Sequence, residues 1–167
     1  MIKPLELPDC RHVQAALGWL ELGTPVEAAR ELEHVSPDLQ AHPDVLEVRW
    51  SIAACQFNWE LCREIAELAT QRAPERVWGW INWAYATRRA TDGGMETAQA
   101  ILVSAAERFP KLAIIPYDIA CCACRTGNVK AARQWLERAF ELDEAKELKL
   151  RALDDPDLER IWRTAEP

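Results

Sequence analysis

The chain has 167 residues, of which 49% are hydrophobic and 28% charged, and its formal net charge is -7 at pH 7. This length and composition predict one soluble globular domain with a core of its own and argue against disorder. No apolar run reaches the roughly eighteen residues of a membrane span, and the first residues lack a secretory signal, so we expect a cytoplasmic protein that binds no membrane.

The charge is unevenly distributed along the chain. Residues 1–84 hold 7 Lys and Arg against 13 Asp and Glu, and the remainder holds 13 against 14. Proteins that bind nucleic acid present an excess of basic side chains to the phosphates. Nucleic acid is therefore not an expected partner.

Four stretches of the chain resemble one another as helix-turn-helix units. They begin at Asp9, Pro43, Val77 and Ala113, which are 34, 34 and 36 residues apart. A helix pair of this length cannot bury both of its apolar faces alone, so neighbouring pairs stack into a solenoid. The expected units are about 9–42, 43–76, 77–112 and 113–146, with a C-terminal cap over 147–167, all in one domain over 1–167.

The first unit shows the expected signals for two helices. Apolar residues recur at helical spacing up to Leu20, and Gly23 supplies a stop with positive φ. Thr24 to Glu27 has the pattern of a capping box with proline at the first helical position. The second helix is predicted to continue to His34.

Turn and cap residues separate the helices of the later units. Asn58 is the predicted N-cap of the second helix in the second unit. Asp92-Gly93-Gly94 marks a turn in the third unit, and Gly127-Asn128 closes one helix of the fourth unit and caps the next. Beyond it, a helix is predicted from Ala145 to Leu153, and Asp155-Pro156 starts a final helix.

These units resemble the tetratricopeptide repeat family over residues 9 to about 144. In the fourth unit, Ile119-Ala120 matches the family's pair of a leucine and a small residue. Gly127 matches the turn, and Ala132 and Ala139 match the two small packing positions of the second helix. The resemblance implies an all-α, right-handed superhelical solenoid of about four antiparallel helix pairs with a C-terminal capping helix.

The resemblance also implies where a partner would bind. Family members mostly bind segments of other proteins on the concave surface formed by the first helix of each unit, at the second, fifth, sixth, ninth, twelfth and thirteenth positions. The resemblance implies no catalytic residue and no cofactor. In the third and fourth units the predicted groove residues are Trp78, Ile81, Asn82, Tyr85, Arg88, Arg89, Tyr117, Asp118, Cys121 and Arg125.

The residue types at these positions suit peptide recognition. Trp, Tyr and Arg dominate binding hot spots, because they combine a large buried area with directional polar contacts. We therefore expect a protein or peptide partner whose apolar side chains pack on Trp78, Tyr85 and Tyr117. Its acidic side chain or terminal carboxylate would bind Arg89 and Arg125, since guanidinium groups bind carboxylates in a bidentate manner.

Two alternatives to a non-enzymatic interaction scaffold stay open. The apolar groove could carry a small molecule or a lipid, or the aromatic surface could be covered in a homodimer. No phosphate-binding glycine loop or nucleophile elbow occurs, so an enzyme is not expected.

The six cysteines are predicted to be reduced and to act mostly as small core residues. Cys121, Cys122 and Cys124 form a cluster, and whether it has a redox role is left open. No second Cys or His pair follows this cluster to complete a zinc site, so no metal is predicted.

Overall fold

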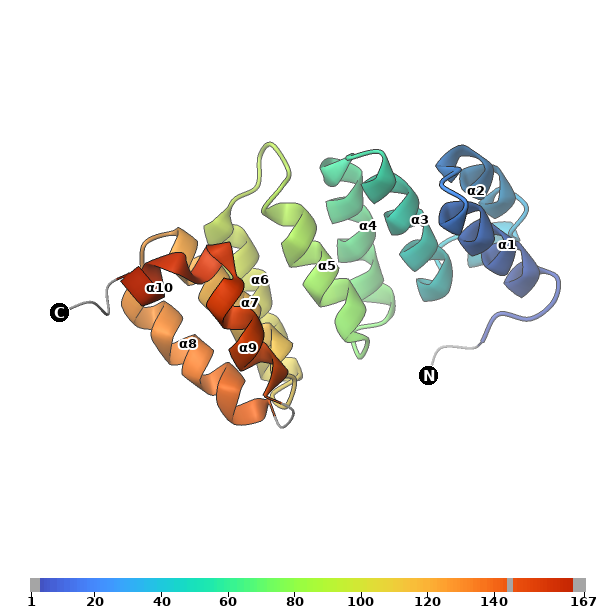
Figure 1. Cartoon of the computed structure of the whole chain (residues 1–167). Helices are drawn as coiled ribbons and strands as arrows, with labels where there is room; N and C mark the ends of the chain where they lie inside the picture. Colours follow the sequence, from blue (N-terminus) through green and yellow to red (C-terminus); the bar gives the residue numbers. More distant parts are fainter. Residues whose placement is uncertain (1–3, 144–145, 164–167) are drawn as a thin grey trace. The chain divides into compact units, whose positions relative to one another are not determined.

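The computed structural model describes residues 4–143 and 146–163 of the chain. Ten α-helices and two short 3-10 helices make up the secondary structure of these residues, and no strand occurs among them (Figure 1). The prediction of an all-α chain is therefore confirmed. Consecutive helices pack against one another in a way that is compatible with a helical repeat, while the right-handed superhelix stays a prediction.

The chain divides into two compact units, residues 1–86 and 87–167. The N-terminal unit contains, in chain order, α1 (Asp9–Glu21), α2 (Pro25–Leu32), the 3-10 helix η1 (Pro37–Leu39), α3 (Pro43–Cys55), α4 (Trp59–Arg72) and nearly all of α5 (Val77–Thr87). Helix α1 packs against α2, and α3 packs against α4, while α3 also contacts both helices of the first pair. Two antiparallel pairs therefore lie side by side in this unit (Figure 1).

The C-terminal unit contains the remaining elements. They are α6 (Met95–Arg108), α7 (Ile114–Arg125), α8 (Val129–Leu142), α9 (Glu147–Asp154), the 3-10 helix η2 (Pro156–Leu158) and α10 (Glu159–Arg163). Helix α7 packs against α6, α8 and η2, and α10 packs against α8. The C-terminal elements thus cover the last helix pair of this unit.

The predicted units and the observed helices begin at nearly the same residues, but the division of the chain between residues 86 and 87 falls inside the predicted third unit, 77–112. The first three units begin at the first residues of α1, α3 and α5, and Ala113 is the N-cap residue of α7. The predicted start of the next helix at Ala145 and the last four residues of the predicted cap, 164–167, lie outside the described residues. The single continuous domain over 1–167 stays a prediction.

Two asparagines cap the second helices of their pairs as predicted. The Asn58 side chain accepts a hydrogen bond from the backbone N–H of Leu61, and the Asn128 side chain accepts one from Ala131, each at 3.1 Å. These bonds satisfy amide groups that have no acceptor inside the helix. Each unit therefore has one equivalent cap.

The turn between α1 and α2 differs from the prediction in one respect. Gly23 has φ of +73°, as expected for a helix stop. Thr24 forms no capping hydrogen bond with its side chain, and its hydroxyl instead donates to the carbonyl oxygen of Trp19 at 2.8 Å. The predicted capping box is wrong, because the hydroxyl closes the preceding helix instead of opening the next one.

Each unit has its own buried apolar core. In the N-terminal unit, one cluster includes Val13, Leu32 and Val45, and a second includes Leu46 and Ile65. In the C-terminal unit, the cluster joins residues of α7 and α8 with Ala152, Leu158 and Ile161 of the C-terminal elements.

The cysteines only partly follow the prediction that they are core residues. Four of them are buried, namely Cys62, Cys121, Cys122 and Cys124. Cys55 is exposed at the end of α3 and Cys10 is half-buried. All six are free thiols.

Among the residues that the structure describes, no helix combines the length and the apolarity needed to cross a bilayer.

Candidate functional site

A hollow of about 490 Å³ opens on the first helices of the N-terminal unit. We call it the inner hollow, and its lining residues are Pro4, Leu5, Cys10, Val13, Gln14, Leu17, Asp44, Glu47, Val48, Ser51 and Trp78. Nine of these eleven residues are the second, fifth, sixth or ninth positions of the first two units and the second position of the third. The surface is therefore hollowed at the positions that the repeat pattern assigns to a concave face.

The inner hollow combines apolar walls with two carboxylates. Val13 and Leu17 come from α1 and Val48 from α3. Asp44 and Glu47 are held by the guanidinium of Arg76, which lies 3.3 Å from the nearer Glu47 oxygen and also bonds Asp44.

The two carboxylates differ from isolated surface acids because one of them is partly buried. Burial raises the pKa of Glu47, and the nearby Arg76 opposes this effect. The hollow thus offers an apolar surface with a negative edge, where one guanidinium faces two carboxylates.

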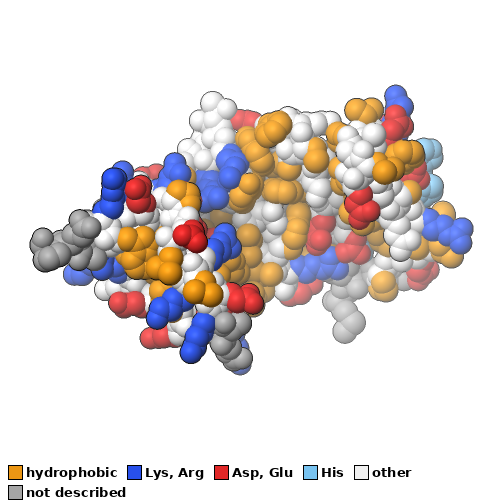
Figure 2. All heavy atoms as spheres, in the orientation of Figure 1, with side chains coloured by type: hydrophobic (Ala, Val, Ile, Leu, Met, Phe, Trp, Pro, Cys, Tyr) orange, Lys and Arg blue, Asp and Glu red, His pale blue; other side chains and the backbone are white. Residues whose placement is uncertain are grey.

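Helix α5 carries four of the predicted groove residues, Trp78, Ile81, Asn82 and Tyr85. Trp78 and Tyr85 both face Trp50 of α3, with ring centroids 5.9 Å and 6.1 Å away, and Tyr85 also lies 5.8 Å from Trp59. The Asn82 amide donates to the carbonyl oxygen of Trp78 at 2.9 Å. On the face shown in Figure 2, apolar side chains gather over this helix, which has no charged residue. Trp78 thus joins the inner hollow to an aromatic cluster.

A second and larger hollow of about 730 Å³ lies in the N-terminal unit among α2, η1, α3 and α4. We call it the outer hollow. Apolar side chains lining it include Leu32, Leu46, Ile52, Ile65 and Leu68, and charged groups at it include Glu33, Arg49 and Arg72. The sequence analysis did not predict it, since none of its residues occupies a concave position of the repeat.

The three predicted groove arginines meet in the C-terminal unit. Arg88, Arg89 and Arg125 line a hollow of about 290 Å³ together with Met95 and Asp157, which we call the arginine hollow. The carboxylate of Asp157 lies 2.9 Å from Arg125 Nη1 and 3.6 Å from Arg88 Nη1. A carboxylate is thus bound where the sequence analysis expected one, but it comes from the same chain.

Two further predicted groove residues of α7 are buried inside the C-terminal unit. Tyr117 is 0% exposed, and its hydroxyl donates to Asp155 at 2.7 Å. The Cys121 sulfur lies 3.9 Å from the same carboxylate, and the Arg151 guanidinium lies 5.1 Å from the centre of the Tyr117 ring. Neither side chain reaches an open groove, because the C-terminal elements cover the face of α7 that the sequence analysis assigned to it.

Burial shifts the titration of the acidic and thiol groups on α7. It raises the pKa of Asp118 to about 6, although the charges of Arg88 and Arg151 oppose the shift. Burial also raises the pKa of Cys121 above its usual range and that of Cys122 to about 11. Both thiols are therefore protonated at neutral pH, which makes them poor nucleophiles.

The ten predicted groove residues fall into two sets. Trp78, Ile81, Asn82 and Tyr85 belong to the N-terminal unit, and the remaining six belong to the C-terminal unit. Two neighbours of the second set were not predicted as site residues, namely Arg151, which lies over Tyr117, and Asp157, which pairs with Arg88 and Arg125. Asp155 was expected only as a helix start, and its side chain does accept a hydrogen bond from the Asp157 N–H while it also binds Tyr117.

Comparison with known proteins identifies no relative. No model of a known protein family matches the chain, and no curated protein matches it. Any assignment of function therefore depends on the residues and on the geometry described above.

Proposed function

We propose that this chain is a non-enzymatic, tetratricopeptide-like repeat protein that binds a segment of another protein at the inner hollow. One observation carries the proposal, namely that nine of the eleven residues lining this hollow occupy the concave positions of the repeat. Concave surfaces on stacked helix pairs are where such proteins hold extended or helical segments.

The lining residues define what the bound segment must offer. Val13, Leu17 and Val48 require apolar side chains, which a partner would bury on binding. Trp78 provides a large, rigid anchor beside them. The carboxylates of Asp44 and Glu47 favour a donor or a basic group on the partner at that edge.

The arginine hollow supports a second element of recognition. Arg88, Arg89 and Arg125 line this hollow together with Asp157, whose carboxylate pairs with Arg88 and Arg125. An acidic side chain or terminal carboxylate of the partner would bind there in place of Asp157. Arg89 and Arg125 thus keep their predicted role of binding a carboxylate of the partner. Asp157 of the chain itself competes with that carboxylate.

The first experiment tests the inner hollow. Peptides are selected against the full chain from a displayed random library, and their affinity is measured for Leu17→Glu and for Leu22→Glu. Leu17 lines the hollow and is 44% exposed, whereas Leu22 is 72% exposed in the turn after α1. We expect Leu17→Glu to weaken binding at least about tenfold, the loss of a modest hot spot. Equal affinities for the two variants would show that the hollow does not bind the peptides.

The second experiment tests the arginine hollow with variants of equal net charge. Arg89→Ala with Arg125→Ala is compared with Arg138→Ala with Arg163→Ala, whose two arginines are exposed elsewhere in the same unit. Only the first pair should weaken the binding of acidic peptides. Asp157→Ala should strengthen it, because the internal carboxylate is removed.

A small-molecule or lipid carrier is a second candidate function, and the outer hollow favours it. A volume of about 730 Å³ lies within the range of ligand pockets. Native mass spectrometry of the purified chain should then reveal a bound small molecule, which Ile52→Trp would displace by filling the hollow. A ligand-free spectrum after mild purification, with no uptake of added fatty acid, would argue for the peptide-binding proposal alone.

A further inference from the structure

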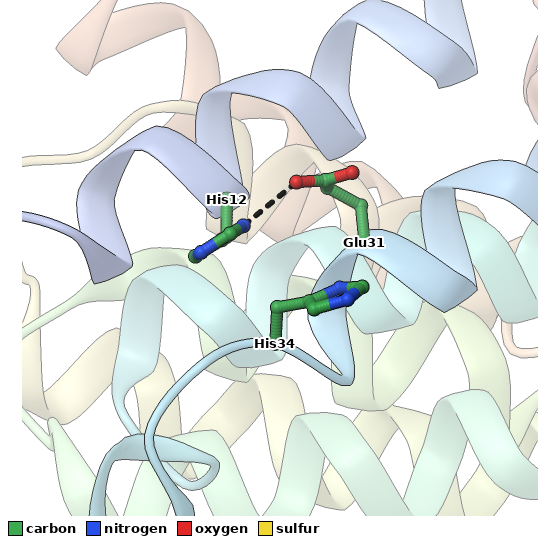
Figure 3. Close-up of side chains that lie close together, drawn as sticks. All are labelled: His12, Glu31 and His34. Atoms are coloured by element: carbon green, nitrogen blue, oxygen red, sulfur yellow. Dashed lines mark hydrogen bonds and ion pairs between the residues drawn. The ribbon is translucent and has the colours of Figure 1, made fainter.

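Three potential metal ligands lie together in the N-terminal unit, outside the inner hollow and the outer hollow. His12 belongs to α1, Glu31 to α2, and His34 to the turn after α2. The His12 Nδ1 and Glu31 Oε1 atoms are 2.7 Å apart, and the two imidazole rings stack with centroids 5.3 Å apart. One ligand atom from each residue lies within 4.8 Å of the others. Figure 3 shows the three side chains close to one another beside α1 and α2.

The cluster is accessible to an ion from solvent. The side chains of His12 and Glu31 keep 27% and 26% of their surface, and His34 is exposed. No backbone segment must therefore open for an ion to enter.

A hydrogen bond selects the coordinating atom of His34. Its Nδ1 lies 3.1 Å from the carbonyl oxygen of Arg30. Because a carbonyl oxygen only accepts, Nδ1 carries the proton and donates it, which leaves the lone pair of Nε2 for an ion. Metal-binding histidines commonly donate their second ring N–H to a backbone carbonyl, since this bond fixes the tautomer and orients the ring.

We propose that His12, Glu31 and His34 bind one Zn²⁺ ion, with water at the fourth position. Imidazole nitrogen and carboxylate oxygen are both zinc ligands, and three protein ligands leave one open position in a tetrahedral site. The hard ions Ca²⁺ and Mg²⁺ prefer oxygen ligands alone, so the two imidazoles favour a transition metal.

The spacing of the ligands requires only a small adjustment. Zinc bond lengths of about 2.0–2.2 Å place neighbouring ligand atoms about 3.4 Å apart in a tetrahedral site. The cluster spreads over at most 4.8 Å, so its side chains close by roughly 1 Å as the ion binds. The ion then replaces the contact between His12 and Glu31.

The ion would link α1 to the end of α2. Helix α2 has only eight residues, and so short a helix depends on tertiary contacts for its stability. An ion that binds the folded chain and not the unfolded chain stabilises it in proportion to its occupancy. Zinc is thus expected to act as a clamp on the first helix pair.

The test uses the full chain without a histidine tag, freed of metal by a chelator. Titration calorimetry with Zn²⁺ should show one ion per chain, and the thermal unfolding midpoint should rise with added Zn²⁺. His34→Ala and His12→Ala should each weaken binding at least about tenfold, a loss found even for outer-shell partners of metal ligands. Glu33→Gln, which changes an exposed carboxylate next to His34 in the sequence but at the outer hollow, should leave the affinity for Zn²⁺ unchanged.

A Co²⁺ complex identifies the ligand type. Histidine and carboxylate ligands give visible d–d bands without a thiolate-to-cobalt charge-transfer band. That band would place the ion on a cysteine such as Cys10 or Cys55 and would overturn the proposal. So would the absence of stoichiometric zinc binding by the wild type, or an unchanged affinity in His34→Ala. His34 is exposed, so this variant decides the question even if His12→Ala fails to fold.

Discussion

The two units of the chain use the same helix-pair pattern but differ in how their first helices are covered. In the N-terminal unit, α1, α3 and Trp78 line the inner hollow, with Pro4 and Leu5 of the preceding segment beside them. In the C-terminal unit, the corresponding face of α7 is buried under the segment that carries Asp155 and Leu158. The repeat pattern thus predicts which residues share one helix face, but it does not predict whether other parts of the chain cover that face.

Local chemistry explains the difference. The inner hollow contains two carboxylates that are held by Arg76 and remain partly hydrated. The buried face of α7 presents mostly alanine, cysteine and Tyr117, and the C-terminal segment covers it with apolar side chains that include Leu158 and Ile161. Its polar contacts are satisfied within the unit, since Tyr117 donates to Asp155 and Arg125 pairs with Asp157.

The largest loss of stability is expected if the C-terminal segment belongs to the core of its unit. Leu158 is 0% exposed, so Leu158→Ala should lower the free energy of unfolding by about 2–5 kcal/mol, because it leaves a cavity. Leu153→Ala, at a side chain that is 62% exposed, is the control and should change little. Hydrogen exchange can localise the loss to α7 and α8. If protection there is unchanged, the segment is only a loosely docked tail.

The next effect is a pH dependence of the stability that arises from Asp118 of α7. The Asp118 pKa is about 6 in the folded chain, above its ordinary value of 3.8. The folded state therefore holds a proton that the unfolded state has lost, and the contribution of Asp118 to stability falls as pH rises from about 4 to about 6. Asp118→Asn should stabilise the chain by about 1–3 kcal/mol at pH 7.5, since one pKa unit corresponds to about 1.4 kcal/mol.

Urea unfolding of the wild type and Asp118→Asn between pH 4 and pH 8 would measure this effect. The advantage of the variant should shrink towards pH 4, because the carboxyl group is then neutral in the folded state and increasingly protonated in the unfolded state. A constant difference across this range would show that the titration of Asp118 is not its cause.

A smaller loss is expected when only the polar contact under the segment is removed. Tyr117→Phe keeps the ring and deletes the hydroxyl that donates to Asp155, which should cost about 1–2 kcal/mol. A double-mutant cycle with Asp155→Ala isolates the coupling between the two side chains. A coupling energy near zero would mean that this hydrogen bond does not hold the segment in place.

The smallest effect should be equal in the two units. Asn58→Ala and Asn128→Ala each remove one N-cap bond of the same length, so each should cost about 1 kcal/mol. Hydrogen exchange should place each loss in its own unit. Losses that spread equally over both units would indicate that they unfold together, which would weaken the comparison drawn above.

The sequence predicted where most helices begin because the signals are local. Apolar spacing, Gly23, Asn58 and Gly127-Asn128 act within one or two helical turns, and the structure agrees with them. The predicted capping role of Thr24 was wrong, because a threonine hydroxyl can bond equally well to the helix that precedes it.

The site was harder to predict because it depends on contacts distant in sequence. Arg125 and Asp157 are separated by 32 residues, as are Arg76 and Asp44. The repeat pattern assigned Arg88, Arg89 and Arg125 to one groove, and all three line the arginine hollow. It could not identify the carboxylate that pairs with Arg88 and Arg125, since charge alone does not distinguish Asp157 from the other acidic residues.

The internal carboxylate at the arginine hollow sets a threshold for any acidic ligand. A group tethered in the same chain competes at an effective concentration of roughly millimolar or above. A ligand with a single carboxylate at micromolar concentration would seldom replace Asp157. A segment with several acidic side chains would gain enough contacts to do so, and the chain would thereby reject the abundant small carboxylates of its surroundings.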